Sequence, residues 1–194
     1  MRATNRRLTI LSEEESFALY GIPDFDETQR QHYLHFNEAE QNIIYYRKSL
    51  TEQVYCALQL GYFKTKQIFF DFTWKDVPED DYKFIIDRYF PENELIQTDV
   101  SRHEFYLQRT TIMKHFEYDN WDSSIHKSML ATELESIIKR DTSTSFILVE
   151  ILSFLRLKKI IRPGYTTLQD LISEALNKER QRLGESLITK LSPE

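Results

Sequence analysis

The segment from Ser49 to Phe70, SLTEQVYCALQLGYFKTKQIFF, carries the strongest helical signal in the chain. It opens with a capping box, because Ser49 can accept a hydrogen bond from the backbone N–H three residues on while Glu52 reaches back. Apolar and small residues then recur at helical spacing, and the apolar surface widens until it covers nearly every side. Lys64 and Lys66 lie near the end where the helix macrodipole is negative. The pattern predicts a buried central helix around which the chain packs.

Further capping boxes predict where other helices begin, because each pairs a capping residue with Glu or Gln three positions later. These pairs are Ser12 with Glu15, Asp26 with Gln29, Asn37 with Glu40, Ser101 with Glu104, and Thr166 with Gln169. Apolar periodicity adds helices over 78–90, over 92–99 (short) and over 123–140, the last with Ile125, Leu130, Leu134 and Ile138 facing inward. The segment 146–157 is apolar on almost every side, which predicts the central helix of the second half.

Only Ile68 to Trp74, IFFDFTW, has a β-like composition. It is either a strand or an extended connection that plugs the core, and the second interpretation is preferred. The sequence therefore predicts an all-α fold with helix-turn-helix-like units and at most one short strand-like segment. Residues 1–10 are expected to form a basic arm, 11–116 a first helical subdomain and 123–194 a second one. The loop-like segment 117–122 marks a soft seam between the two subdomains.

The composition narrows the class of protein. Four glycines and five prolines in 194 residues leave few turns, which favours long helices. No apolar run approaches the roughly 20 residues of a membrane span, and no signal-peptide core is evident at the N-terminus. One cysteine excludes an internal disulfide and fits a reducing compartment. A cytoplasmic helical protein without a membrane partner is expected.

The charge is unevenly distributed along the chain. The net charge of −6 counts against a simple nucleic-acid binder, because phosphate neutralisation needs lysine and arginine. However, basic segments alternate with acidic ones, so that a folded chain could present one basic face. The most basic short segment contains Arg156, Lys158, Lys159 and Arg162 within seven residues.

The segment from Phe146 to Ala175 fits a helix-turn-helix, in which a buried support helix precedes a helix that presents short polar residues at its N-terminus. The turn contains Arg162 and Gly164, and the second helix opens with Thr166 and Thr167. An ordinary helical hairpin with a solvated basic end is the alternative, and the pattern alone favours that alternative.

Catalytic patterns are weak. His32 and His35 have the spacing of a shared metal site but lack a second pair of ligands nearby, and Cys56 lies in an apolar helix where a thiol is inert. The acidic segment 71–81 could resemble a two-metal nuclease, although an acidic helix N-terminus explains it better. No glycine-rich phosphate loop is present. We therefore expect no catalysis, no metal and no cofactor in this chain.

Three segments together resemble the N-terminus of transposases of the Tn-three family, the replicative enzymes of class II transposons. They are Leu8 to Phe25 (LTILSEEESFALYGIPDF), Val54 to Phe63 (VYCALQLGYF) and Ile160 to Leu171 (IIRPGYTTLQDL), in the order and at roughly the spacing of that family. The resemblance implies a helical region that recognises the terminal inverted repeats of the transposon, in the bacterial cytoplasm at the nucleoid. It also implies that the catalytic Asp-Asp-Glu residues lie downstream. The acidic segment 71–81 departs from the family, which has a basic, glycine-containing turn there.

On this resemblance, double-stranded DNA is the expected partner, and two sets of residues are candidates for contacting it. The candidate base readers or register-setters are Arg162, Thr166, Thr167 and Gln169. The candidate phosphate contacts are Arg2, Arg6, Arg7, Arg47, Lys48, Lys64, Lys66, Lys158 and Lys159. The alternative function is a protein-interaction or dimerisation module of the transposase, using Leu183, Leu187 and Leu191, or a truncated regulatory copy.

Overall fold

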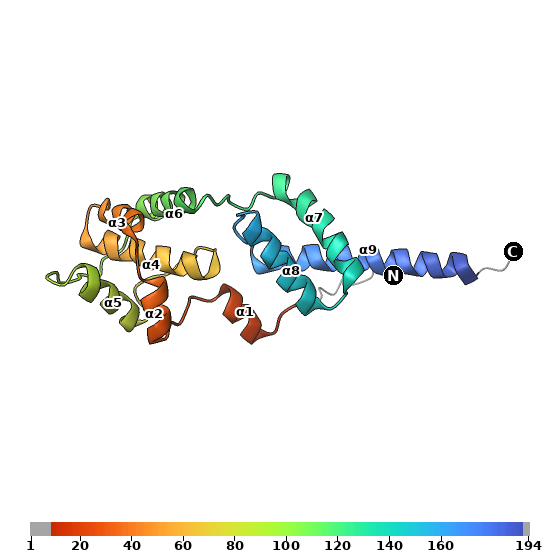
Figure 1. Ribbon diagram of the computed structural model, residues 1–194, viewed down its shortest axis with the longest axis horizontal. Helices are drawn as coiled ribbons and strands as arrows, with labels where there is room; N and C mark the ends of the chain where they lie inside the picture. Colours follow the sequence, from red (N-terminus) through yellow and green to blue (C-terminus); the bar gives the residue numbers. More distant parts are fainter. Residues whose placement is uncertain (1–8, 192–194) are drawn as a thin grey trace. The chain divides into compact units, whose positions relative to one another are not determined.

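The computed structural model describes the backbone of residues 9–191 and the side chains of residues 9–188. Over this range the chain forms α-helices and no strand, which confirms the predicted all-α class (Figure 1). The helices are α1 (Glu13–Tyr20), α2 (Glu27–Tyr33), α3 (Glu38–Tyr45), α4 (Leu50–Lys66), α5 (Glu79–Tyr89), α6 (Arg102–Phe116), α7 (Ser123–Arg140), α8 (Thr144–Leu157) and α9 (Tyr165–Leu191).

The chain packs into two compact units. One comprises Phe17–Tyr118 and is called the α4 unit here; the other comprises the described residues up to Ser16 together with those from Asp119 onward, and is called the α9 unit. This grouping describes packing alone. The division into folding subdomains at 11–116 and 123–194 stays a prediction.

The predicted central helix is confirmed as α4, the core of the α4 unit. Both bonds of its capping box form, since the Ser49 side chain accepts from the Glu52 N–H while Glu52 accepts in return from the Ser49 N–H. Val54, Cys56 and Leu58 are fully buried. The helices α2, α3, α5 and α6 all pack against α4. α4 therefore positions these four helices.

Another part of the chain approaches α4 closely at Gly61. A Cβ atom there would overlap the Leu34 side chain, which is itself fully buried after α2. The absence of a side chain at Gly61 therefore lets the chain after α2 lie directly on α4.

The segment 68–74 is an extended connection, as preferred from the sequence, and no strand forms there. Ile68, Phe70 and Phe72 are buried at alternate positions. The Tyr55 hydroxyl donates to the Phe72 carbonyl at 2.8 Å, and the two rings stack 4.4 Å apart. This connection therefore packs its aromatic side chains against Tyr55 and Tyr62 of α4.

Two predictions made for the α4 unit are wrong. Residues 92–99 form no helix, because the segment is held extended by side chains from elsewhere: the Thr51 hydroxyl donates to the Ile96 carbonyl and the Trp74 indole to the Thr98 carbonyl. Ser101 caps α6, but the Glu104 carboxylate contacts Arg47 instead of completing a capping box.

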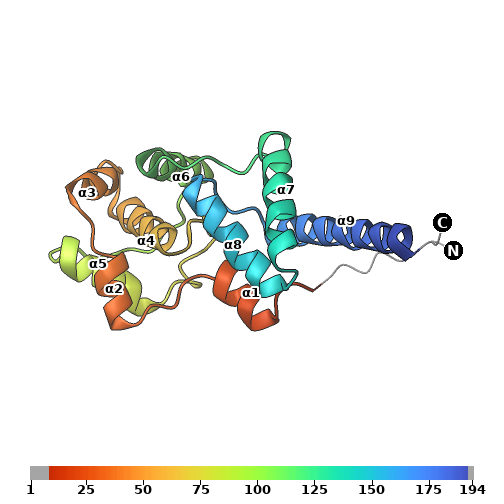
Figure 2. The same ribbon diagram turned by 45° about the vertical axis from the view of Figure 1, so that its right-hand side comes forward.

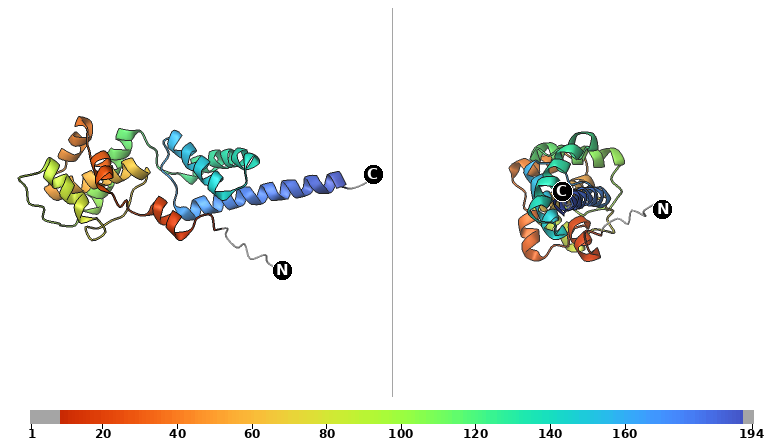
Figure 3. Two further views of the ribbon diagram at one scale, coloured as in Figure 1. Left: turned by 60° about the horizontal axis from the view of Figure 1, so that its bottom comes forward. Right: turned by 90° about the vertical axis from the view of Figure 1, so that its right-hand side faces the viewer.

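In the α9 unit, α7 packs against both α8 and α9 (Figure 2). Leu130, Leu134 and Ile138 of α7 are buried as predicted, whereas Ile125 is exposed. The helix α9 continues well beyond its packing partner α7 (Figure 3). A parallel bridge joins Asp119 to Ile160, so that the entry to α7 lies beside the turn between α8 and α9.

Two predictions about the helical pair of the α9 unit are corrected. The helix α8 is not surrounded by protein, because Val149 is 61% exposed and Leu157 81% exposed. The helix α9 begins at Tyr165, one residue before the predicted cap, and the Leu168 N–H bonds to the Gly164 carbonyl. Thr166 therefore lies inside the first turn rather than capping it.

Candidate nucleic-acid interface

The turn between α8 and α9 presents a basic surface, called the α8–α9 turn here. Arg156, Lys158 and Lys159 are all exposed at the end of α8. Lys159 has φ 53°, the left-handed conformation that glycine adopts most easily, and its carbonyl accepts from the Asp119 N–H at 2.8 Å. Cationic side chains and the first backbone N–H groups of α9 therefore lie close together along the chain.

The four candidate base readers differ in accessibility. Thr166 is exposed, whereas Arg162, Thr167 and Gln169 are half-buried. The Gln169 side chain donates to the Tyr165 hydroxyl at 3.4 Å within the same helix. Thr166 is thus the most accessible of these side chains.

Arg47, a candidate phosphate contact, lies inside the α4 unit rather than on its surface. Its side chain is only 4% exposed, and its guanidinium Nη1 lies 3.2 Å from the Glu104 carboxylate. Its Nε donates to the Ile43 carbonyl. Arg47 therefore links the end of α3 to α6, and its buried position argues against a phosphate contact.

Two of the remaining candidate cations of the α4 unit, Lys64 and Lys66, are also held by hydrogen bonds. The Lys64 ammonium donates to the His35 carbonyl at 2.8 Å and lies 3.3 Å from the buried Glu40 carboxylate, while Lys66 donates to the Gly21 carbonyl at 2.7 Å. Lys48 is exposed. The N-terminal arm residues Arg2, Arg6 and Arg7 lie outside the described residues.

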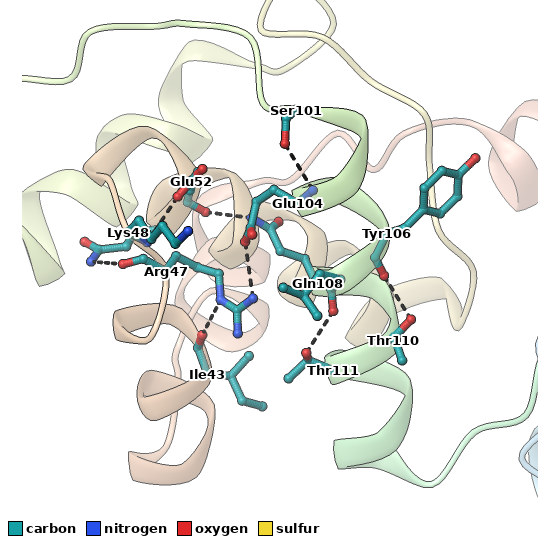
Figure 4. A network of polar contacts seen from close by, with 12 residues as sticks. Ile43, Arg47, Lys48, Glu52, Ser101, Glu104, Tyr106, Gln108, Thr110 and Thr111 are labelled. Carbon is teal, nitrogen blue, oxygen red and sulfur yellow. Dashed lines mark hydrogen bonds and ion pairs between the residues drawn. The ribbon is translucent and has the colours of Figure 1, made fainter.

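The Arg47–Glu104 pair is one end of a polar network between α4 and α6 (Figure 4). Gln108 donates to Glu104 at 3.1 Å and to the Glu52 carbonyl at 3.1 Å. Gln59 then donates to Gln108 at 2.7 Å. Because these side chains are buried and bonded to one another, they fix the position of α6 along α4.

At the end away from Arg47, the polar network between α4 and α6 reaches Arg109. Its guanidinium lies 3.8 Å from the centre of the Phe105 ring, donates to the Phe70 carbonyl, and pairs with Asp71 at 2.7 Å. Burial lowers the pKa of Arg109, although Asp71 acts in the opposite direction. Arg109 therefore anchors α6 to the extended connection.

The outward side of α6 is a surface that the sequence analysis missed. We call it the α6 outer face, and its exposed residues are Arg102, His103, Tyr106, Leu107, Thr110 and Lys114. No acid lies among them, since Glu104, the one acidic residue of α6, is turned inward. Figure 4 shows Tyr106 pointing away from Arg47 and the network. The sequence shows the spacing of the polar residues along 102–114. However, the negative charge of Glu104 offsets their positive charge in the sequence, and only the structure shows that Glu104 is turned away from this face.

The acids of 71–81 do not converge. Asp71 pairs with Arg109, and the Asp76 carboxylate accepts from the Thr73 N–H and hydroxyl. Asp81 is buried and accepts from the Tyr62 hydroxyl at 2.9 Å. Within the described part of the chain, no three His, Cys, Asp or Glu side chains lie close enough to hold a metal ion.

Burial raises the pKa of Asp81, even though hydrogen bonds from Tyr62 and Arg30 act to lower it. His35 contacts Arg88, whereas His32 lies with its ring edge-on to Tyr33. These groups have structural partners within the α4 unit.

Together these features define an all-α protein whose described helices form two packed units. Residues 10–175 match a family described as a domain of unknown function, DUF4158, and the chain belongs to this family. No curated protein matches the chain significantly. None of the helices in the described range is both long and apolar enough to cross a membrane.

Proposed function

We propose that this chain is the DNA-binding N-terminal region of a transposase, which recognises transposon terminal inverted repeats and catalyses nothing by itself. The family supports this proposal, because its domain is found in transposases of the Tn-three family. The three segments that resemble those transposases add to this support.

The α8–α9 turn is the observation that carries the proposal. It combines exposed Arg156, Lys158 and Lys159 with the N-terminus of α9, where backbone N–H groups favour a phosphate. Thr166 is exposed one residue inside that helix. Such contacts with phosphate supply affinity and orientation, while side chains in the groove supply sequence choice.

The test is a fluorescence-anisotropy titration of the chain with a labelled duplex carrying the transposon's inverted repeat, against a scrambled duplex, at several salt concentrations. The proposal predicts tighter binding to the repeat and affinity that falls steeply with salt. Equal and weak binding to both duplexes would refute it.

A variant pair localises the contact. Lys158→Ala/Lys159→Gly should weaken binding to both duplexes and reduce the salt slope by about two, without loss of folding, because glycine suits the backbone at 159. The matched control is Lys127→Ala/Lys178→Ala in the same unit, since both of these lysines pair with Glu174. The control should change the salt slope less.

A second candidate function, a dimerisation module of the transposase, is favoured by one observation. Leu183, Leu187 and Ile188 of α9 are 45%, 58% and 69% exposed. Leu191, the third predicted member of this stripe, lies beyond the described side chains. Sedimentation of the wild type against Leu183→Glu/Leu187→Glu tests this function, and a wild type that stays monomeric at high concentration would refute it.

A further inference from the structure

We propose that the α6 outer face is the surface with which the α4 unit enters the major groove of double-stranded DNA; this inference rests on the proposed function. It assigns the DNA contact of the first half of the chain to residues that the sequence pattern did not single out. Four observations about α6 support it.

The first observation is the sign of the charge. The α6 outer face combines Arg102 and Lys114 with neutral side chains and has no acid, because Glu104 is turned inward and paired with Arg47. In the same unit α5 exposes more acids than bases: Glu79, Asp80 and Asp87 are exposed beside Lys83 and Arg88, whereas Asp81 is buried. Within this unit a polyanion is therefore attracted more to the α6 outer face than to α5.

The second observation is the shape of the surface. The six residues of the α6 outer face fall within an arc of about 140° of the helix, so that they form one continuous strip. Arg102 and Lys114 lie twelve residues apart, a rise of about 18 Å. A major groove about 12 Å wide is flanked by phosphates on both sides, so a helix lying across it can reach one backbone with each cation.

The third observation is the chemistry between the two cations. Tyr106 is 50% exposed and its hydroxyl, which accepts from Arg102 at 3.5 Å, can donate to a base edge. Thr110 is exposed, and its hydroxyl, which donates to the Tyr106 carbonyl at 2.9 Å, can still accept from a base edge. Leu107, 42% exposed, offers an apolar surface of the kind that contacts a thymine methyl group. Phosphate contacts at the ends with hydroxyl and apolar groups between them are the arrangement of a recognition helix.

The fourth observation is the rigid backing of α6. The buried network from Arg47 through Glu104, Gln108 and Gln59 ties its inner side to α4. Side chains presented by a fixed helix keep their spacing, which base readout requires. An exposed acid, Asp71, pairs with Arg109 beside this face, so its charge is already partly compensated.

The experiment uses the whole chain and the duplexes described above. Arg102→Ala/Lys114→Ala should weaken binding to both duplexes by roughly tenfold and reduce the salt slope by about two. Thr110→Ala should instead reduce the preference for the repeat, by about five- to 150-fold if it reads one base pair. The matched control is Lys75→Ala/Lys83→Ala, which removes the same charge from exposed sites of the same unit and should leave affinity nearly unchanged.

A variant that is expected to bind DNA more tightly distinguishes the loss of a DNA contact from the loss of folding. His103→Arg adds a cation to the α6 outer face and should tighten binding to both duplexes and steepen the salt slope by about one. A misfolded chain cannot produce this result. Failure of His103→Arg to tighten binding would overturn the inference.

The outcomes separate the inference from the proposed function. A wild type that prefers the repeat, together with face variants that bind like it, overturns the inference and leaves the proposed function standing. A wild type that binds neither duplex refutes both. Face variants that bind DNA normally but dissociate a dimer in sedimentation would assign the α6 outer face to a protein partner, and would also overturn the inference.

Discussion

Removing the Arg47 guanidinium should destabilise the α4 unit sharply, although Arg47 looks like a surface cation in the sequence. In the structure its side chain is 4% exposed and its Nη1 lies 3.2 Å from Glu104, whose side chain is 12% exposed. Arg47→Met keeps most of the side-chain volume but leaves the Glu104 carboxylate without its cation. The perturbation therefore isolates charge compensation from packing.

The size of this loss of stability depends on the hydrogen bond that the Glu104 carboxylate keeps. Breaking a buried ion pair by removing one partner costs about 3–5 kcal/mol. Gln108 still donates to the Glu104 carboxylate at 3.1 Å, which places the expected loss at the lower end, about 3 kcal/mol. Because a domain is stable by only about 5–15 kcal/mol in total, this loss should be visible in any unfolding assay.

The assay is urea unfolding followed by tryptophan fluorescence. The chain has two tryptophans, Trp74 in the α4 unit and Trp121 in the α9 unit. Trp121→Phe leaves one reporter, so the transition of the α4 unit is measured alone. Lys48→Met is the control, because this neighbouring lysine is exposed and should change stability by less than about 0.5 kcal/mol.

A double variant tests the physical reason. Arg47→Met/Glu104→Leu removes both charges, while Gln108 keeps its bond to the Glu52 carbonyl, so most of the loss should be recovered. An Arg47→Met cost below about 1 kcal/mol, or a double variant no more stable than the single one, would refute the reasoning.

Three further predictions concern the buried residues Gly61, Cys56 and Asp81 of the α4 unit. Gly61→Ala should reduce the stability of the fold by about 1–3 kcal/mol, because its methyl group meets the buried Leu34. The control Gly184→Ala, with open space around it, should be neutral or stabilising by up to about 1 kcal/mol. Equal thermal midpoints for the two variants would contradict this prediction. Burial raises the pKa of the Cys56 thiol to about 12, so Ellman's reagent at pH 8 should react with it only after unfolding, and rapid labelling of the native chain would show that the thiol is accessible. The raised pKa of Asp81 means that its folded carboxyl holds a proton more readily than the unfolded one, so its stabilising contribution is complete below the unfolded pKa of about 3.9 and is lost as pH rises through the folded pKa. The stability of the wild type relative to Asp81→Asn should therefore fall from about pH 4 towards neutral pH, and a difference that stays constant or rises in urea titrations would disprove it.

The sequence determined the parts of this protein that depend on near neighbours. Capping residues three positions from their partners located the starts of α2, α3 and α4, because those hydrogen bonds form within one turn. The apolar breadth of 50–63 identified the central helix for the same reason. Local signals also predicted the extended connection after α4. The segment from Glu92 to Asp99 shows, however, that contacts with distant parts of the chain can override a helical pattern.

Only the tertiary structure decided which charges are available at the surface. Arg47 and Glu104 are 57 residues apart in sequence, and their pairing turns a candidate phosphate contact into a buried anchor while it leaves the α6 outer face without a negative charge. Tertiary packing also determined which apolar side chains of α8 are exposed, because composition alone does not show which side of a helix packs against another helix. Periodicity reports which side of a helix is apolar, whereas the free energy of a charge depends on the groups that folding brings to it.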